Sequence, residues 1–490
     1  MIKSFALATT KLKSLKDNSH IIDFLVLSFV VILVAILYLH LGRDPLFDWD
    51  ESIYAQLGVE ILKSHHWLTP TWNGQIWLEK PPGIAWLTAL SLSLFGHNEF
   101  AARFFMPLLA GSSLYLTYLI GRSLKDRTLG ILAMLLLANM NLFLSRARVL
   151  NTDIALLFTI LFTVYLVMSK RRPWLVALAI ALSFFFKGFA GSLSFIIVLP
   201  LLIKKSKKYL LQVIGYWLLF ILPWHLYQLI VNGSNFITPY FKEQVLRRAT
   251  VPIEFHLESR WYYFHYLYQN LDITWIFLLV LGLLFLVFKL RSSVAHRWSL
   301  ITLIWWFFFP LALFSLAKTR LYWYILPIYP AIALIIAYFL RQLASLHQLG
   351  YQILISFLGL YAIFTLQHFL TLVDPYHSRV NLPPKLELAT WAHHFSNQGL
   401  LVLVPYHERV AEAILPSEQR ISSSFRYGGA PSIVFYAQQP VTYFYDLDKF
   451  KSALVSNRLV LLTKQDFQQL QLHSLKILKS QGDYLLTQVK

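Results

Sequence analysis

Long, nearly uninterrupted apolar runs dominate the chain, and residues 24–39 (FLVLSFVVILVAILYL) are typical of them. A helix needs about 20 such residues, at about 1.5 Å per residue, to cross a hydrocarbon core of about 30 Å. The helices and strands of a water-soluble core need shorter runs. The pattern therefore predicts an all-α polytopic membrane protein with about 11 transmembrane helices. The predicted spans are residues 21–41, 101–121, 128–146, 150–169, 174–188, 189–203, 209–231, 272–290, 299–317, 321–341 and 350–372.

Residues 174–203 admit two interpretations. One helix would be about 45 Å long, which exceeds a span, whereas two helices would each be about 22 Å long. With two spans, every strongly basic segment falls on one side of the membrane, but with one span KKSKK at 204–208 lies opposite KRR at 170–172. Cytoplasmic loops carry an excess of Lys and Arg. The sequence therefore predicts two spans, a cytoplasmic N-terminus and an external C-terminus.

This topology places two long loops outside, residues 42–100 and residues 232–271. Within the first outer loop, residues 51–64 (ESIYAQLGVEILKS) and residues 83–95 (GIAWLTALSLSLF) show helical apolar periodicity. Helices with one apolar face lie in the plane of the membrane interface. We therefore expect two interfacial helices in this loop, which hold its polar residues at the membrane surface.

The tail, residues 375–490, has a different pattern from the membrane domain, residues 1–374. Short apolar runs alternate with more polar, helix-like segments, and runs of this length between polar segments predict strands. The tail therefore reads as a small extracytoplasmic α/β domain. The predicted strands are residues 400–406, 432–437, 459–463 and 484–489.

Composition agrees with the membrane prediction and excludes several chemistries. Only 14% of the residues are charged, 57% are hydrophobic, and the mean hydropathy is +0.55; soluble chains carry about 25% charged residues. The chain has no cysteine, which excludes disulfides, thiol catalysis and cysteine metal sites. Cytoplasmic loops explain the net charge of +19 without a nucleic-acid partner.

Charged side chains stand out on the outer side. The stretch LFDWDESIY carries Asp48, Asp50 and Glu51 directly after the first span, and Asp153 begins the fourth. An isolated loop carboxylate is ordinarily solvated, and Asp153 is also placed to cap its helix. Lys and Arg at the ends of spans ordinarily extend their charged groups to the lipid headgroups. Such residues are concentrated on the inner side, so cations are unexpected on the outer side. A lipid phosphate would give them a partner. These cations are Lys80, Lys187, Lys318 and Arg320, with Arg247 and Arg248 carrying less weight.

The ordered motifs resemble a known family. The segments WDESIYAQLGVEIL, WLEKPPG, ARVLNTD, FFFKGFAG and AKTRLYWYILPIYP follow one another as they do in the bacterial membrane glycosyltransferases of the C-type (GT-C) fold. This group includes the lipid A aminoarabinose transferases and the dolichyl-phosphate-mannose protein mannosyltransferases. The resemblance covers residues 44–345 and weakens over the tail. It implies an enzyme of the bacterial inner membrane that moves a sugar from a polyprenyl phosphate to a lipid, glycan or protein acceptor on the outer face.

The resemblance also implies roles for residues. Asp50 matches the family's proposed base or acceptor-positioning acid, Glu51 completes the Asp-Glu pair, and Asp153 matches a second outer acid. A hydroxyl acceptor needs a base within hydrogen-bond reach, and cations stabilise the charge on a departing phosphate. The residues that would bind the donor phosphate are Lys80, Lys187, Arg260, Lys318, Arg320 and Tyr324.

A divalent metal is a further implication of the resemblance. Glu79 matches a position that binds a metal in some members, and His256 lies in a segment similar to the family's His-containing outer loop. Zinc, magnesium or manganese would be the candidate ion. Two ligands alone do not define a zinc site, and polar loop residues are the alternative interpretation of both positions.

Two other functions compete with sugar transfer. A transporter or lipid flippase would place its charges near the membrane midplane, commonly within repeated halves, whereas here the notable charges lie at one face and no internal repeat is evident. A non-enzymatic assembly scaffold would leave the outer carboxylates and cations unexplained. The sequence therefore favours the glycosyltransferase.

Overall fold

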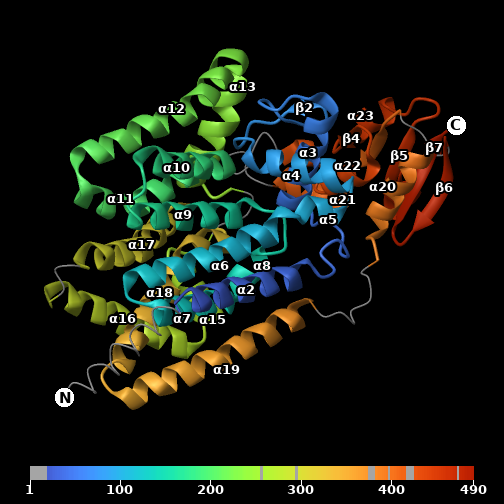
Figure 1. The fold of residues 1–490 in the computed structure, drawn as a ribbon. Helices are drawn as coiled ribbons and strands as arrows, with labels where there is room; N and C mark the ends of the chain where they lie inside the picture. Colours follow the sequence, from blue (N-terminus) through green and yellow to red (C-terminus); the bar gives the residue numbers. More distant parts are fainter. Residues whose placement is uncertain are drawn as a thin grey trace, which may run out of the picture.

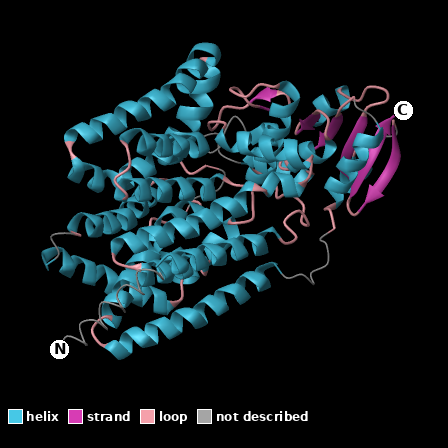
Figure 2. Ribbon diagram, in the orientation of Figure 1, coloured by secondary structure: helices cyan, strands magenta, loops and turns pink. Residues whose placement is uncertain are grey.

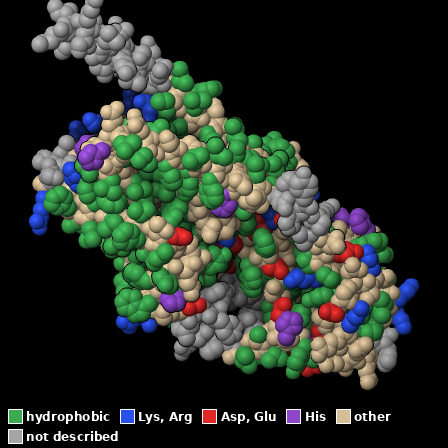
Figure 3. Space-filling view, turned by 90° about the horizontal axis from the view of Figure 1, so that it is seen from below, with side chains coloured by type: hydrophobic (Ala, Val, Ile, Leu, Met, Phe, Trp, Pro, Cys, Tyr) green, Lys and Arg blue, Asp and Glu red, His purple; other side chains and the backbone are tan. Residues whose placement is uncertain are grey.

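The structure is a computed structural model, and it describes residues 19–253, 258–292, 296–373, 381–395, 398–414, 424–471 and 474–490. Helices build a large body, and a small sheet lies at one end of the molecule (Figures 1 and 2). On the face seen in Figure 3, hydrophobic side chains cover most of the body, while charged side chains gather on the sheet domain and in the hollow beside it. An apolar outer surface is what a bilayer requires.

Within the described residues, eight helical stretches are long and apolar enough to cross a membrane. All eleven predicted spans fall on helices, but α7 and α9 are shorter than a full span, and residues 173–205 count as one stretch. The structure therefore confirms a multispanning helical body rather than the number eleven. The body helices are α2 (Ser19–Tyr38), α6 (Phe105–Leu124), α7 (Arg127–Ala138), α8 (Asn141–Arg146), α9 (Thr152–Met168), α10 (Pro173–Lys187), α11 (Ser192–Lys205), α12 (Lys207–Asn232), α16 (Ile273–Ser292), α17 (Arg297–Leu316), α18 (Tyr329–Ala344) and α19 (Gln348–Val373).

The chain turns back between α10 and α11, as the charge argument predicts. The short 3-10 turn η1 (Gly188–Gly191) brings Gly191 so close to Ser183 that an added Cβ would lie 2.4 Å from the Ser183 carbonyl carbon. A continuous helix would hold residues eight apart at about 12 Å. The Tyr209 hydroxyl, at the start of α12, donates to the Arg171 carbonyl oxygen at 2.7 Å. The two basic segments therefore lie together at one end of the body.

The C-terminal sheet has five strands in the order β4-β3-β5-β7-β6. Strand β3 pairs in parallel with β4 and β5, and β7 pairs antiparallel with β5 and β6. The strands are β3 (Leu400–Leu403), β4 (Val441–Phe444), β5 (Leu459–Thr463), β6 (Leu475–Gln481) and β7 (Tyr484–Val489).

The predictions of β3, β5 and β7 are confirmed, but the predicted strand at 432–437 is wrong. Residues Ser432–Ala437 form helix α22, and every one of them is buried. Helix α22 packs against α3 on one side and α20 (Pro384–Phe395) on another. A short apolar run that is covered on all sides gives no periodicity by which to separate a helix from a strand.

The first outer loop contains α3 (Asp50–Ser64), the hairpin β1 (Thr71–Trp72) and β2 (Gln75–Ile76), and α4 (Gly83–Phe95). The expectation that the first helix lies at the interface is wrong, because residues 51–61 of α3 are all buried. Helix α4 covers one side of α3, and α22 covers another. Helix α4 itself keeps an exposed apolar edge, formed by Leu90, Leu94 and Phe95, which suits the membrane interface.

The C-terminal domain is docked on this loop through a shared hydrophobic core. Polar contacts fix its orientation. Lys385 Nζ lies 2.8 Å from the Asp48 carboxylate, and the Tyr436 hydroxyl donates to Glu99 Oε1 at 2.9 Å. The Ser432 backbone N–H also donates to Asp48, at 3.2 Å. The domain therefore covers the polar end of the helical body.

Candidate active site

The three acids of LFDWDESIY have three different environments. Glu51 is 2% exposed and forms a two-pronged ion pair with Arg103, with both N···O distances at 2.8 Å. The backbone N–H groups of Phe47 and Leu150 complete four hydrogen bonds to its carboxylate. Glu51 therefore joins the start of the outer loop to α5 (Glu99–Arg103) and to the turn before α9. Asp48 anchors the C-terminal domain, and this leaves Asp50 facing solvent.

Asp50 begins α3 and follows a strained residue. Trp49 has φ of 68°, in the left-handed region that non-glycine residues rarely adopt. The Asp50 side chain is 43% exposed, and Oδ1 lies 3.8 Å from Lys80 Nζ. Lys80 also donates to the Tyr54 hydroxyl. Burial by itself lowers the pKa of Lys80, but Asp50 and Tyr54 together raise that pKa above its usual range, so the ammonium stays charged.

Asp153 lies in a buried ion cluster at the start of α9. Its carboxylate lies 2.9 Å from Arg146 Nη2 and accepts a hydrogen bond from Lys187 Nζ. The alternative role as helix cap is wrong, because Asn151 Oδ1 caps α9 by accepting from the N–H groups of Asp153 and Ile154, at 2.8 and 2.9 Å. The carboxylate of Asp153 is thus left to hold two cations. Lys187, the last residue of α10, reaches it because the chain turns at Gly188.

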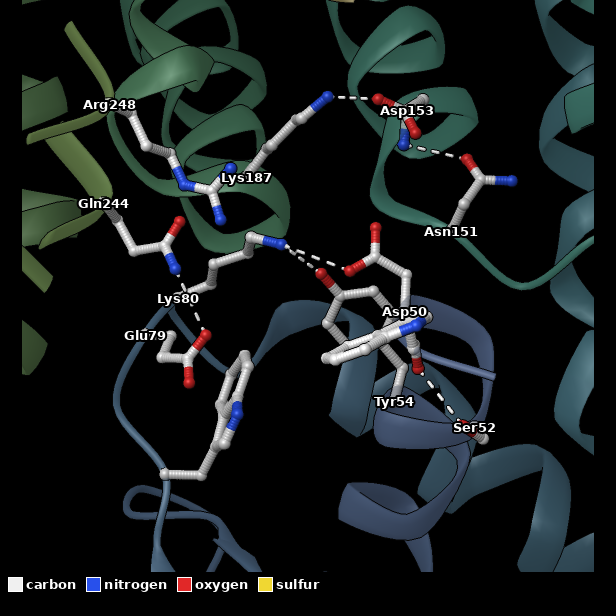
Figure 4. A network of polar contacts seen from close by, with 12 residues as sticks. Asp50, Ser52, Tyr54, Glu79, Lys80, Asn151, Asp153, Lys187, Gln244 and Arg248 are labelled. Atoms are coloured by element: carbon white, nitrogen blue, oxygen red, sulfur yellow. Dashed lines mark hydrogen bonds and ion pairs between the residues drawn. The ribbon is translucent and has the colours of Figure 1, made fainter. Parts of the chain in front are cut away.

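Arg248 and Tyr324 close the other side of the site. Arg248 Nη1 donates to the Tyr324 hydroxyl at 3.1 Å, and Lys187 Nζ lies 5.5 Å from the centre of the Tyr324 ring. Backbone hydrogen bonds from Lys318 and Thr319 hold the segment at 248–249 in place, both at 3.1 Å. In Figure 4, Lys80, Arg248 and Asp50 extend toward one another from three separate segments, with Lys187 and Asp153 beside them. We call Asp50, Lys80, Asp153, Lys187, Arg248 and Tyr324 the carboxylate–cation cluster.

Three of the predicted phosphate ligands lie outside this cluster. Arg320 is 5% exposed and donates to the carbonyl oxygens of Ser315, at 2.9 Å, and Glu258. It therefore caps the end of α17 and fixes the second outer loop. Lys318 and Arg260 are exposed, and in the part of the chain that the structure describes neither side chain forms a hydrogen bond or an ion pair.

Glu79 connects the first outer loop to two other parts of the chain. The Tyr427 hydroxyl donates to Oε1 at 2.7 Å, Gln244 Nε2 donates to Oε2 at 3.1 Å, and Arg426 Nη2 lies 3.7 Å from Oε1. Trp77 Nε1 donates to Tyr427 in turn, at 2.7 Å. Burial raises the pKa of Tyr427 well above its ordinary value, so the hydroxyl keeps its proton and remains a donor.

These neighbours do not fit a metal. A divalent cation needs several oxygen or nitrogen lone pairs, whereas Glu79 is surrounded by hydrogen-bond donors and a guanidinium. Among the described residues, no group of three or more His, Asp or Glu side chains is placed to hold a metal ion. His256, the second predicted ligand, lies outside the described residues.

Sequence reasoning missed Arg146 and the tail residues Arg426 and Tyr427. Arg146 could have been found, because it is one more cation at the outer end of a predicted span, the signal that singled out Lys187. The tail residues gave no such signal. They lie in an aperiodic segment beyond the reach of the resemblance, and only the docking of the domain brings them to Glu79.

Comparisons with known proteins agree with this architecture. A family model described as dolichyl-phosphate-mannose-protein mannosyltransferase matches residues 79–227. An uncharacterised protein of Aquifex aeolicus (strain VF5) is 31% identical over 331 residues, which cover 64% of this chain and 64% of that protein. The undecaprenyl phosphate-alpha-4-amino-4-deoxy-L-arabinose arabinosyl transferase 2 of Pseudomonas fluorescens (strain Pf0-1) is 29% identical over 329 residues, which cover 63% of this chain and 58% of the relative. The chain thus spans about three fifths of the length of these curated relatives.

The fold likeness extends over nearly the whole chain. The crystal structure of ArnT from Cupriavidus metallidurans bound to undecaprenyl phosphate superposes with a TM-score of 0.73, covering 94% of this chain and 97% of that chain at 16% identity. The chain therefore has the fold of the GT-C membrane glycosyltransferases. Within that fold, its matched segments are similar to the dolichyl-phosphate-mannose-protein mannosyltransferase family model and to the aminoarabinose transferases.

Proposed function

We propose that the protein transfers a sugar from a polyprenyl-phosphate donor to a lipid, glycan or protein acceptor at the outer membrane surface. The carboxylate–cation cluster carries this proposal. It places an accessible carboxylate, Asp50, beside cations that come from three distant segments of the chain. Relatives named as undecaprenyl-phosphate sugar transferases support the donor class, as does the related structure that holds undecaprenyl phosphate.

The geometry suits a displacement at the anomeric carbon of the donor sugar. Lys80, Arg248 and Lys187, with the Tyr324 hydroxyl, bind the phosphate and stabilise the negative charge that grows on it as the bond from C1 to the phosphate oxygen breaks. Asp50 accepts the proton of the acceptor hydroxyl while that oxygen forms the new bond to C1. The products are the glycosylated acceptor and polyprenyl phosphate.

Asp153 has a positioning role in this mechanism. Its side chain is 2% exposed and is neutralised by Arg146 and Lys187, so it has no route to an acceptor hydroxyl. It instead fixes the Lys187 ammonium next to the ring of Tyr324. Glu51 has a structural role, because its ion pair with Arg103 stabilises the segment that begins α3.

We also propose the membrane arrangement. Eleven helices cross a bacterial inner membrane, with residues 1–374 as the membrane domain, a cytoplasmic N-terminus, and residues 375–490 as an extracytoplasmic domain. Basic side chains paired with acids around the turn from α6 to α7 support this orientation, because this turn lies at the end of the body far from the sheet (Figure 1). The pairs are Arg122 and Arg127 with Asp23, and Arg341 with Asp126.

The divalent metal implied by the resemblance has no step in this mechanism. The described neighbours of Glu79 are donors and a cation, so we assign Glu79 to joining the first outer loop, the second outer loop and the C-terminal domain. It lies next to Lys80 in the chain, and its hydrogen bonds therefore fix the backbone from which Lys80 reaches Asp50.

The alternative is a transporter or lipid flippase, which the position of the cluster does not favour. A transporter binds its cargo near the midplane, whereas this cluster lies at the end of the body that the C-terminal domain covers. A glycosyltransferase and a transporter of this lipid would both bind a polyprenyl-phosphate sugar. Only the glycosyltransferase consumes it when no vesicle separates two compartments.

The test is donor turnover by the purified full-length protein in detergent. Polyprenyl-phosphate sugar is supplied with an envelope extract as acceptor, and release of polyprenyl phosphate is measured by mass spectrometry. We expect release by the wild type and by Asp44→Asn, which changes an exposed acid of the same loop. Asp50→Asn should fold and release at least about a hundredfold less, as loss of a general base predicts. Intact donor with every variant, or normal release by Asp50→Asn, would overturn the proposal.

A further inference from the structure

A cavity of about 280 Å³ lies between the first outer loop and the C-terminal domain. The hairpin β1–β2 forms one wall, and the edge strand β4 forms the other. Neither the transfer mechanism nor the resemblance assigns a role to this place. The lining residues that matter below are Asn73, Gln75, Arg426, Val441, Thr442 and Tyr443.

Hydrogen bonds between the first outer loop and the C-terminal domain fix the walls of this cavity. The Asn73 side-chain amide donates to the Val441 carbonyl oxygen at 2.6 Å, and the Val441 N–H donates back to Asn73 Oδ1 at 3.0 Å. The loop therefore pairs with the sheet edge as a neighbouring strand would. Since backbone groups alternate in direction along a strand, Tyr443, two residues further on, presents its N–H and C=O at this same edge.

Several polar groups remain available inside. The side chains of Gln75 and Thr442 are exposed, and among the described residues neither forms a side-chain hydrogen bond. Arg426 Nη1 donates to the Ile76 carbonyl oxygen at 3.1 Å, and Nη2 lies 3.7 Å from Glu79, which leaves further N–H groups of the guanidinium for a ligand. The cavity thus offers an amide, a hydroxyl, a guanidinium and a strand edge within one small space.

We infer that this cavity is a subsite for one sugar residue of a glycan acceptor, an inference that rests on the proposed function. Uncharged hydroxyl groups pair well with amides, hydroxyls and backbone groups, which both donate and accept. A phosphate fits poorly, because Arg426 is the sole cation among the lining residues and shares its charge with Glu79. A peptide strand fits poorly as well, because Asn73 already occupies the edge of β4 at Val441.

The volume and the position support this occupant. Sites for drug-sized ligands span roughly 300–1,000 Å³, so a cavity of about 280 Å³ accommodates a single ring more readily than a chain. Arg426, which lines the cavity, lies close to Glu79. Lys80 follows Glu79 in the chain and lies close to Asp50. A glycan held here would extend toward the carboxylate that activates its hydroxyl. The subsite would therefore select the acceptor, separately from the donor site.

The test measures binding of a panel of free mono- and disaccharides to the full-length protein in lipid nanodiscs. Binding is detected by saturation-transfer difference NMR. Thr442→Trp fills the cavity from an exposed strand position that tolerates an aromatic residue. Lys476→Trp is the matched control, because it is exposed on β6, the opposite edge of the same sheet. A Ser/Thr peptide pool and inorganic phosphate serve as competing probes.

We expect at least one saccharide to bind the wild type and Lys476→Trp, and to bind Thr442→Trp about tenfold more weakly. Saccharide binding is measured without any donor, so the subsite is tested even if the proposed transfer activity fails. Equal binding by Thr442→Trp and the control would overturn the inference. So would binding of the peptide pool or phosphate in its place, or the absence of binding by every saccharide.

Discussion

Replacing Glu51 by Gln separates a structural from a catalytic role for the second acid of the Asp-Glu pair. Glu51 is buried, and all four of its hydrogen bonds come from donors, two of them on Arg103. A Gln side chain keeps the size but turns an NH₂ group toward one of these donors and removes the charge. The expected defect is therefore in folding rather than in chemistry.

The magnitude follows from the ion pair. Breaking a buried pair costs about 3–5 kcal/mol. Arg103 keeps hydrogen bonds to the backbone carbonyl oxygens of Leu41, Asp44 and Pro45, so its guanidinium is only partly stranded. We therefore expect a loss near the lower limit, about 3 kcal/mol. Such a loss is a large fraction of a typical stability of about 5–15 kcal/mol.

The assay pairs thermal unfolding in detergent with donor turnover per folded molecule. Glu51→Gln should unfold at a clearly lower temperature, while the protein that remains folded keeps most of its turnover. The double variant Glu51→Leu/Arg103→Leu should recover part of the lost stability, because neither charge is then buried alone. A Glu51→Gln protein with wild-type stability and no turnover would refute this reasoning and restore Glu51 to the catalytic residues.

Four further changes test the domain contact, the metal, the pH dependence and the topology. Tyr427→Phe removes one donor to Glu79 and leaves Trp77 Nε1 unpaired, so it should lower stability by about 1–3 kcal/mol in thermal unfolding, whereas exposed Tyr406→Phe should not. Turnover should survive treatment with a strong chelator, and its loss with rescue by added zinc, magnesium or manganese would contradict the assignment of Glu79. His97, in the first outer loop, contacts the C-terminal domain, with Nε2 3.0 Å from the Phe435 carbonyl oxygen. Burial lowers the pKa of His97 from 6.5 to about 4, so the docked form binds fewer protons than the undocked form between these values. Docking of the C-terminal domain should therefore weaken as the pH falls through that window, seen as faster proteolysis of the tail. Because the chain has no cysteine, a thiol reagent that cannot cross membranes should label Gln75→Cys in intact spheroplasts but not Lys207→Cys, and the reverse would invert the topology.

Short-range patterns along the sequence predict much of the fold. Long apolar runs predict the helices of the body, and the positions of KRR and KKSKK predict the turn at Gly188–Gly191, which the structure confirms. Burial contributed by distant segments is not visible in such patterns. Helix α3 reads as amphipathic on its own, but the tail covers its remaining face.

The candidate site likewise combines residues that local sequence patterns predict with residues whose contacts depend on distant segments. Asp50, Lys80, Asp153, Lys187 and Tyr324 come from motifs that resemble a family or from cations on the unexpected side of the membrane, and the structure brings them together. Arg320 carries the same sequence signal, yet it binds backbone carbonyl oxygens, because the last turn of α17 at Ser315 and the irregular segment at Glu258 leave acceptors that need a donor. No local pattern predicts which backbone groups will be left unpaired in this way.

We propose that Lys80, Arg248 and Tyr324 hold the donor phosphate beside Asp50. A structure of the full-length protein in nanodiscs with polyprenyl phosphate tests it most directly. We expect phosphate density within hydrogen-bond distance of Lys80 Nζ and the Arg248 guanidinium, and loss of that density in Lys80→Met. Phosphate bound instead at Lys318, Arg260 or elsewhere on the outer surface, with the cluster unchanged, would contradict it.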